Sequence, residues 1–277
     1  SAFCNAGFDL FGTSLVGYSN NTVVILVISV LIIIGGLGFT VLLELYNFKG
    51  IKKLSLHAKL VIITTLILVF GGAMLMLLFE YSNPQTIANM NIKDKLLNSF
   101  FASVSPRTAG FNSVPTNGMT LASKILTVIL MVIGGSPGST AGGLKTVTCG
   151  ILVLTVISLI RGREDVECFG RRFTKELVIK AFTIVFIGLS LVIGVTMILS
   201  YTEVGASFID LLYESASALG TVGLTLGLTP NLSAVGKILI MIMMYLGRVG
   251  PITVMLALTR KRKKSGYKYP EGKILIG

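Results

Sequence analysis

Long apolar stretches alternate with shorter polar ones along the chain. Five of them meet or exceed the roughly 20 residues that a helix needs to cross a bilayer core of about 30 Å. They cover residues 22–46, 58–79, 120–160, 176–200 and 235–259. The pattern therefore predicts an all-α membrane protein with five crossings.

Composition agrees with this class. Of the 277 residues, 53% are hydrophobic and only 13% are charged, and the mean hydropathy is +0.85. The net charge of +12 would suit a nucleic-acid partner, but the basic residues gather in alternate segments between the apolar stretches, as in cytoplasmic loops. We therefore expect the lipid bilayer and no nucleic acid as a partner, and a cytoplasmic C-terminus. The basic residues that gather in these segments are Lys49, Lys52, Lys53, Lys59, Arg161, Arg163, Arg171, Arg172, Lys175 and the cluster at 260–264.

A short phrase centred on glycine occurs three times, each time in a weakly polar loop beside an apolar stretch. Its glycines lie too far apart for a solenoid repeat. A second phrase, Ile34–Gly38, recurs at Ile133–Gly138 and Leu246–Gly250, so the loop and the following helix are repeated together. The loop positions are Asn5, Ala6 and Gly7, then Thr108, Ala109 and Gly110, then Thr221, Val222 and Gly223.

The repeated unit reads as a membrane helix, a short pore helix, a filter loop and a second membrane helix. Residues 1–57 hold only the loop and second helix of one unit. Residues 58–175 form the next unit, with a broken second helix, and residues 176–259 form the last. A tail at 260–277 follows.

Two amphipathic segments, Asp94–Val104 and Phe208–Leu219, are predicted to be the short pore helices. Asp94, Asp210 and Glu214 fall near their starts, where acids offset the positive end of the helix dipole. The opposite ends then direct partial negative charge towards the filter loops. Backbone carbonyls there can replace the water shell of a dehydrated alkali cation, and glycine permits the required backbone angles. A single glycine alone would indicate only a turn, whereas the recurrence favours a cation filter.

The stretch at 120–160 is interrupted by a run of glycine, serine and proline through which a regular helix cannot continue. A broken helix is stable in a bilayer only where its freed backbone groups meet water or protein, so this run is expected to face the pore just inside the filter. The alternative is a packing face of small residues, since Gly138 and Gly142 have GxxxG spacing. The run comprises Gly134, Gly135, Ser136, Pro137, Gly138, Ser139, Thr140, Ala141, Gly142 and Gly143.

Arg248 lies well inside the last apolar stretch. A charge there costs about 2.5–3.5 kcal/mol on insertion scales unless it faces water or a partner. We therefore expect Arg248 to face the pore or the glycine-rich run.

Catalysis is not indicated by the sequence. His57 stands alone, without the cysteines or carboxylates of a tetrahedral metal site. The hydroxyl and thiol groups have no histidine base within sequence reach. Cys4, Cys149 and Cys168 are too scattered for a disulfide framework. We expect neither enzymatic activity nor an organic cofactor.

These residues resemble the Trk/Ktr/HKT superfamily of potassium transport proteins, and most closely its Ktr-type ion-translocating subunit. The likeness covers essentially the whole chain and is carried by residues 3–8, 105–111 and 220–225. In the family, four helix, pore-loop, helix repeats surround one central pore with pseudo-fourfold symmetry, and the three phrases match its second, third and fourth repeats. The resemblance therefore implies that the first repeat is absent from this sequence.

The resemblance also implies a function: K⁺ uptake across the plasma membrane through a channel-like pore. K⁺ at the filter is the implied transported ion, and Na⁺ is a candidate activator. Residues 134–143 would form an intramembrane gating loop, with Arg248 as a barrier to cations beside it. The implied partners are a second copy, with residues 274–277 at the dimer interface, and a cytosolic ring of nucleotide-binding regulatory subunits. An ion-coupled secondary transporter of another solute remains the alternative.

Overall fold

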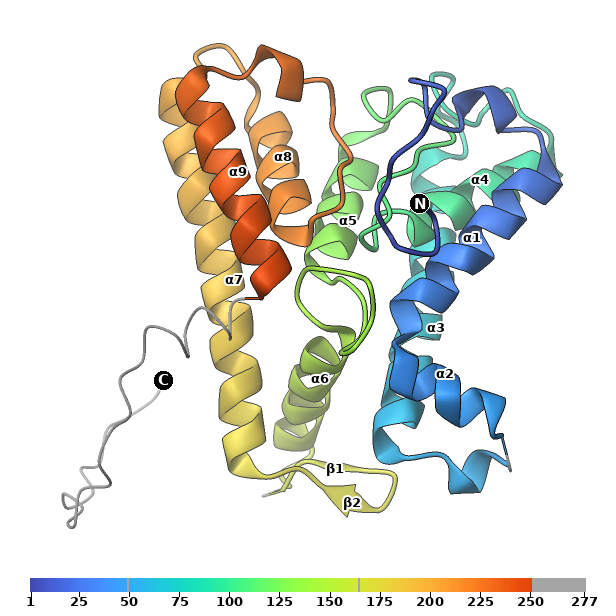
Figure 1. The fold of residues 1–277 in the computed structure, drawn as a ribbon, viewed down its shortest axis with the longest axis vertical. Coiled ribbons are helices and arrows are strands. Elements are labelled where there is room, and N and C mark those ends of the chain that lie inside the picture. The colour runs from blue at the N-terminus through green and yellow to red at the C-terminus, as the bar shows by residue number, and fades with distance from the viewer. Residues whose placement is uncertain (49, 164, 251–277) are drawn as a thin grey trace.

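The structure is a computed structural model that describes residues 1–48, 50–163 and 165–250 (Figure 1). Helices α7, α8 and α9 form one flank, α1 to α4 form the other, and α5 and α6 lie between them. The α-helices of the described residues are α1 Thr22–Leu37, α2 Phe39–Tyr46, α3 Leu56–Glu80, α4 Ile92–Val104, α5 Leu121–Val132, α6 Thr146–Ile160, α7 Lys175–Thr202, α8 Phe208–Gly220 and α9 Ala234–Val249. A hairpin, β1 Glu167–Cys168 with β2 Arg171–Arg172, joins α6 to α7.

Two of the predicted crossings are continuous helices. By length and composition, α3 and α7 can each cross a membrane, and they match the apolar stretches at 58–79 and 176–200. The break predicted inside 120–160 is also confirmed, because α5 and α6 are separate helices joined by residues 133–145.

The crossing expected over residues 22–46 is not one straight helix. The segment forms α1 and α2, which are bent by 104° at Gly38. Gly38 has a φ of 90° and a ψ of 143°, a positive-φ conformation that an α-helix cannot contain. Taken together, α1 and α2 are long and apolar enough to cross a membrane. By length and composition, the described residues therefore hold two membrane spans, or three if the bent pair is one span.

The short helices α4 and α8 begin within two residues of the predicted starts. Helix α4 packs against α3 and α1, and α8 packs among α5, α7 and α9. Every residue of α8 from Tyr213 to Gly220 is buried. In α4, Phe101, Ser103 and Val104 are buried. The C-terminal end of each short helix is therefore enclosed by protein, as a segment that ends at membrane depth requires.

The β1–β2 hairpin was not anticipated from the sequence. Its two connecting residues, Phe169 and Gly170, have φ values of 51° and 74°. Both central positions of a type I′ hairpin turn require positive φ, and the usual sequence signals are Asn-Gly and Asp-Gly. A phenylalanine at the first position gives no such signal, so the amino-acid sequence does not predict the hairpin.

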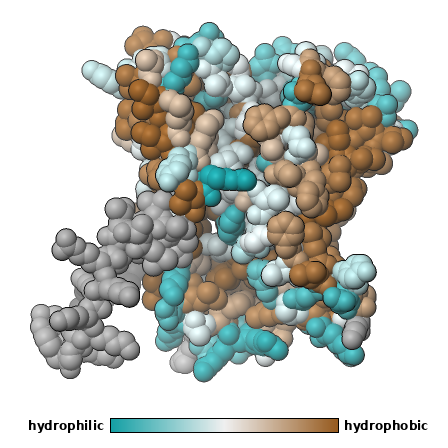
Figure 2. Space-filling model, in the orientation of Figure 1, coloured by the Kyte–Doolittle hydropathy of each residue, from teal (hydrophilic) through white to brown (hydrophobic). Residues whose placement is uncertain are grey.

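The surface separates apolar flanks from polar ends. In Figure 2, brown hydrophobic residues cover the flanks of the molecule, and teal hydrophilic residues gather at the end that carries the hairpin. Paler and polar residues occupy the middle of this face, between the flanks. Such apolar flanks suit helices that face lipid. Several predicted features lie outside the described residues: the last part of the stretch at 235–259, Lys49, the cluster at 260–264 and the tail at 260–277, with its residues 274–277.

The same carboxylate clamp ties the two membrane helices together in two of the predicted units. At the end of α3, Glu80 accepts hydrogen bonds from the amide and hydroxyl of Thr120, the N-cap of α5, both at 2.8 Å. At the end of α7, Glu203 accepts from the amide of Ser233, the N-cap of α9, at 3.0 Å. The end of α3 is therefore joined to the start of α5 in the same way as the end of α7 is joined to the start of α9.

Replacing Glu80 with alanine is expected to destabilise the fold by about 2 kcal/mol or more, because several donors are left without a partner inside protein. Glu80 is only 4% exposed and also accepts from Asn83 at 2.6 Å and Thr86 at 2.5 Å. The matched control is Glu176→Ala, which removes an exposed ion pair with Lys180 on α7. Melting temperatures of the purified proteins in detergent should fall for E80A and stay unchanged for E176A; equal values would contradict the clamp.

Candidate functional site

The three filter segments meet at one place although they are far apart in the sequence. Gly7, Gly110 and Gly223 line one cavity of about 500 Å³. A Cβ atom at Gly7 would lie 2.7 Å from the Ala109 carbonyl oxygen and 3.5 Å from that of Val222. A Cβ atom at Gly110 would clash with the same Val222 oxygen. The segments are therefore grouped closely about one axis, and their carbonyls lie where they touch.

All three segments share one unusual backbone. The glycine and the residue two positions before it are left-handed, while the residue between them is not. Such alternation turns successive carbonyl groups to the same side of the chain. Left-handed φ is uncommon outside glycine, so three matching pairs mark equivalent, specifically shaped segments. The φ values are 49° and 72° at Asn5 and Gly7, 71° and 79° at Thr108 and Gly110, and 52° and 91° at Thr221 and Gly223.

Side chains fix neighbouring filter segments to each other. The Asn5 amide donates to the Arg107 carbonyl oxygen and to the Thr108 hydroxyl, both at 3.3 Å, which joins the first segment to the second. The Thr116 hydroxyl donates to the Thr225 carbonyl oxygen at 2.7 Å, which joins the second to the third. The three segments are thus held together by specific hydrogen bonds.

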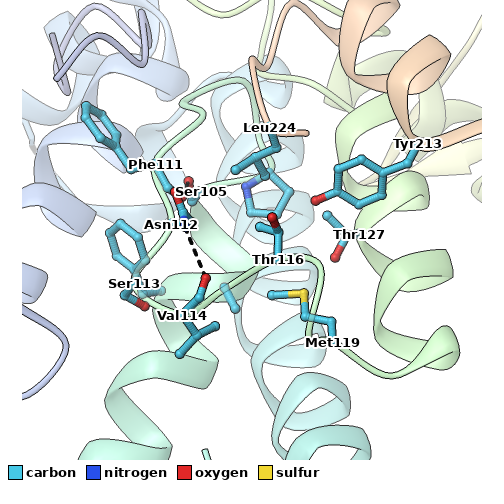
Figure 3. A pocket seen from close by; sticks show the side chains of 13 residues that line it. Ser105, Phe111, Asn112, Ser113, Val114, Thr116, Met119, Thr127, Tyr213 and Leu224 are labelled. Carbon is cyan, nitrogen blue, oxygen red and sulfur yellow. Dashed lines mark hydrogen bonds between the residues drawn. The ribbon is translucent and has the colours of Figure 1, made fainter. Parts of the chain in front are cut away.

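A small cavity of about 20 Å³ lies behind the filter, between α4, α5 and α8 (Figure 3). The Tyr213 side chain points into it from α8. Across the cavity, the Asn112 side chain donates to the Val114 carbonyl oxygen at 3.2 Å. The Ser105 hydroxyl donates to the Phe111 carbonyl oxygen. These bonds brace the turn that follows the middle filter segment.

Glu214 has a role that the sequence did not reveal. Of the two acids expected near the start of α8, only Asp210 lies in the first turn. Glu214 is 5% exposed and accepts hydrogen bonds from the hydroxyls of Thr225, at 3.0 Å, and Thr229. The carboxylate therefore holds the segment that leaves the third filter loop, instead of offsetting the helix dipole.

Residues 133–145 leave α5 and return to α6 as a closed, non-helical loop. The Gly134 amide donates to the Leu144 carbonyl oxygen at 2.8 Å, and the Leu144 amide donates to the Val132 carbonyl oxygen at 3.1 Å. Ile133 and Leu144 thereby form a parallel bridge at the base. Because the run is not helical, the alternative of a GxxxG helix-packing face is wrong.

The tip of this loop fills the break between α1 and α2. The amide and hydroxyl of Ser136 donate to the Gly36 carbonyl oxygen at 3.0 and 2.7 Å. The Phe39 amide donates to the Gly138 carbonyl oxygen at 3.1 Å. A side chain at Gly38 would lie 2.7 Å from the Pro137 carbonyl oxygen. The groups freed by the helix break thus find their partners in the loop, as backbone at membrane depth requires.

The loop also lies directly against the filter. The Thr140 hydroxyl donates to the Asn5 side-chain oxygen of the first filter segment at 3.4 Å, and to the carbonyl oxygen of Phe3, two residues before that segment, at 3.2 Å. A side chain at Gly142 would clash with the Thr221 hydroxyl of the third segment. Residues 134–143 therefore sit beside two of the three filter segments.

Two positively charged side chains donate hydrogen bonds to backbone carbonyls of this loop. Arg248, at the end of α9, donates from Nη1 to the Thr140 carbonyl oxygen at 2.9 Å. Lys145 donates from Nζ to the next carbonyl, that of Ala141, at 2.8 Å. Sequence reasoning singled out Arg248 and missed Lys145. The available signal was a lysine inside the apolar stretch at 120–160, next to the glycine run.

The second repeated phrase has a structural cause. A side chain at Gly35 of α1 would clash with the Phe3 carbonyl oxygen, and one at Gly247 of α9 would clash with the Leu219 carbonyl oxygen. Phe3 and Leu219 each stand four residues before a filter glycine. At both places the helix therefore needs glycine where it passes the residues that precede the filter segment.

Residues 1–48, 50–163 and 165–250 contain no group of three or more His, Cys, Asp or Glu side chains suited to holding a metal ion. Cys4, Cys149 and Cys168 are free thiols. The polar groups that converge are backbone carbonyls and hydroxyls around one axis. This arrangement can bind a monovalent cation through neutral oxygens.

The fold and site define an integral membrane protein in which three non-helical segments, each followed by a helix of the bundle, meet at one place. A family model described as "TrkH: Cation transport protein" matches residues 1–266. The chain belongs to this family of cation transport proteins.

Similar proteins agree with this placement. The "Potassium/sodium uptake protein NtpJ" of Enterococcus hirae is 45% identical over 284 residues, and the "Ktr system potassium uptake protein B" of Bacillus subtilis is 40% identical over 277 residues. Each alignment covers 100% of this chain and 62% of the relative, so the chain spans 62% of the length of these proteins. The crystal structure of the potassium transporter TrkH from Vibrio parahaemolyticus matches with a TM-score of 0.75 at 20% identity, covering 93% of this chain and 56% of that one. This match confirms the predicted helical fold with pore loops.

Replacing Gly110 with alanine is expected to lower cation transport about tenfold or more. The substitution imposes strain of about 1–3 kcal/mol at a left-handed position and pushes a methyl group against the Val222 carbonyl. Gly17→Ala is the control, because Gly17 is not left-handed and an added methyl group there would meet no atom within 4 Å. Uptake of ⁸⁶Rb⁺ by proteoliposomes compares the two variants. Equal uptake by G110A and wild type would refute the filter assignment.

Proposed function

We propose that this chain forms the pore of a K⁺ uptake system in the plasma membrane. The ion moves passively down its electrochemical gradient through a filter of backbone carbonyls contributed by residues 5–7, 108–110 and 221–223. One observation carries this proposal: three segments with the same alternating backbone converge around one axis. The names of two similar proteins, both potassium uptake proteins, support K⁺ as the ion.

The chemistry of the filter favours a monovalent cation. Neutral carbonyl oxygens replace a water shell without the strong field of fixed carboxylates, which suits a large, weakly hydrated ion. Na⁺ is the proposed activator of K⁺ transport. The name of one relative, a potassium/sodium uptake protein, is consistent with an interaction with this ion. Covalent chemistry and an organic cofactor have no part in this proposal.

The loop at 134–143 is the proposed gate. It lies beside the filter, and Arg248 and Lys145 hold two successive carbonyls in it. In this position the loop obstructs the path below the filter, and the two positive charges repel a cation that approaches. Release of these bonds would let the loop move aside.

The proposed orientation places the hairpin end in the cytoplasm. Basic residues gather there, including Lys52, Lys53, Arg171 and Arg172, as the positive-inside rule expects. The C-terminus would then be cytoplasmic. A second copy and a cytosolic ring of nucleotide-binding regulatory subunits are the proposed partners. The repeats at 1–57, 58–175 and 176–259 remain the proposed organisation of the chain.

Ion flux in proteoliposomes tests the proposal directly, with the complete natural subunit. The expected result is K⁺ flux that follows the K⁺ gradient, reverses when the gradient is reversed and exceeds Na⁺ flux. Saturable uptake of another solute, coupled to an ion gradient and without K⁺ conductance, would instead identify an ion-coupled secondary transporter.

Arg248→Ala is expected to raise resting K⁺ flux several-fold, because it removes the hydrogen bond to Thr140 and one positive charge beside the loop. Lys145→Ala should act in the same direction through Ala141. Lys237→Ala, also on α9 but near its first turn, is the control and should leave the flux unchanged. Resting ⁸⁶Rb⁺ flux in proteoliposomes provides the measurement. Wild-type flux in both R248A and K145A would remove these residues from the gate.

A further inference from the structure

An apolar groove runs between α3 and α6, on the outside of the molecule and away from the filter. It has a volume of about 320 Å³ and is lined mainly by aliphatic side chains of the two helices. Several of these remain open to the surroundings: Ile67 is 64% exposed, Val153 58% and Phe169 53%. The groove is therefore open along the flank where the protein meets lipid.

The length of the groove matches one leaflet of a bilayer. Its wall on α3 runs from Leu60 to Leu68, a rise of about 12 Å at 1.5 Å per residue. Half of a bilayer core is about 15 Å thick. One end reaches Ile133 at the base of the proposed gating loop, and the other reaches Phe169 in the hairpin. The groove thus extends from the hairpin end of the molecule towards its middle.

The hairpin end of the groove is surrounded by basic groups. The Lys59 ammonium lies 5.8 Å from the centre of the Phe169 ring, directly at the mouth. It also donates to the Lys52 carbonyl oxygen at 3.4 Å, which places the 51–53 turn beside it. The hairpin adds Arg171.

Two acidic residues that the structure describes in the segment between α6 and α7 already have partners. Asp165 pairs with Arg172 and Glu167 pairs with Arg163, each at 3.4 Å. Both pairs are exposed and therefore weak. They do not cancel the charge of Lys59, so the mouth attracts an anion.

We propose that this groove binds an anionic glycerophospholipid of the cytoplasmic leaflet, with one acyl chain along α3 and α6 and the phosphate at Lys59. An apolar groove in a bilayer loses dispersion contacts unless hydrocarbon fills it. Because lipid tails are as apolar as the groove, selectivity must come from the headgroup, where basic side chains attract anionic lipid. The assignment of leaflet rests on the orientation given under the proposed function.

A bound chain would touch the base of the loop. Ile133 forms the bridge to Leu144 there, and Thr146 donates from its amide to the Gly135 carbonyl oxygen at 3.0 Å. Both Ile133 and Thr146 line the groove. The lipid therefore packs against the stem on which the loop is held, and its presence stiffens that stem.

Native mass spectrometry of the complete subunit in detergent, with added palmitoyl-oleoyl phosphatidylglycerol or phosphatidylcholine, tests this site. The expected result is preferential retention of phosphatidylglycerol. Val153→Phe fills the groove and should abolish the retention, whereas Val156→Phe is the matched control, a valine of α6 that is 54% exposed and does not line the groove. Lys59→Gln should weaken retention about fivefold, whereas Lys237→Gln, far from the groove on α9, should not.

Several outcomes would overturn the proposal. Equal retention of the two lipids would show that the headgroup is not recognised. Unchanged retention in V153F would show that the acyl chain does not bind in the groove. Loss of dimer mass in V153F, with lipid retention intact, would assign the groove to a contact between copies. Lipid retention and K⁺ flux are measured separately. If the protein retains the lipid but does not conduct K⁺, only the proposed function is contradicted. Conduction without lipid retention would contradict only this site.

Discussion

Backbone groups that a helix break frees inside a membrane must find partners, and most of this structure follows from that constraint. The chain breaks at Gly38 and again at 133–145, and the two breaks satisfy each other: Ser136 donates to Gly36, and Phe39 donates to Gly138. Neither break would be stable alone in lipid. The constraint also applies to the filter segments, which have no regular secondary structure and whose residues Asn5, Ala109 and Val222 are buried.

This mutual satisfaction links the loop to distant parts of the chain. The loop contacts the filter through Thr140, the α1–α2 break through Ser136, and α9 through Arg248. Movement of the loop therefore requires new partners for α2 and for Arg248. Helix α2 is in turn tied to the start of α3, since Glu44 accepts from the Ser55 amide at 3.0 Å. The start of α3, at the hairpin end of the molecule, is thus connected to the loop through α2, which makes hydrogen bonds at both of its ends.

Features with a local cause were predictable from the sequence. The recurrence of Gly7, Gly110 and Gly223 predicted equivalent loops, and the amphipathic segments predicted α4 and α8, because turn chemistry and helical periodicity are local. The 104° bend at Gly38 was not predictable, because one glycine in an apolar helix is common and the bend depends on the loop that fills it. Glu214 and Lys145 were missed for the same reason: their partners are set by tertiary contacts.

The central claim is that main-chain oxygens of three re-entrant segments coordinate a desolvated monovalent cation. Anomalous diffraction from crystals of the complete subunit grown in Rb⁺ tests it most directly. The account predicts a Rb⁺ peak on the common axis, in contact with the carbonyl oxygens of Ala6, Ala109 and Val222. A peak held only by side-chain oxygens in the outer cavity, or no ordered peak among the three segments, would contradict it.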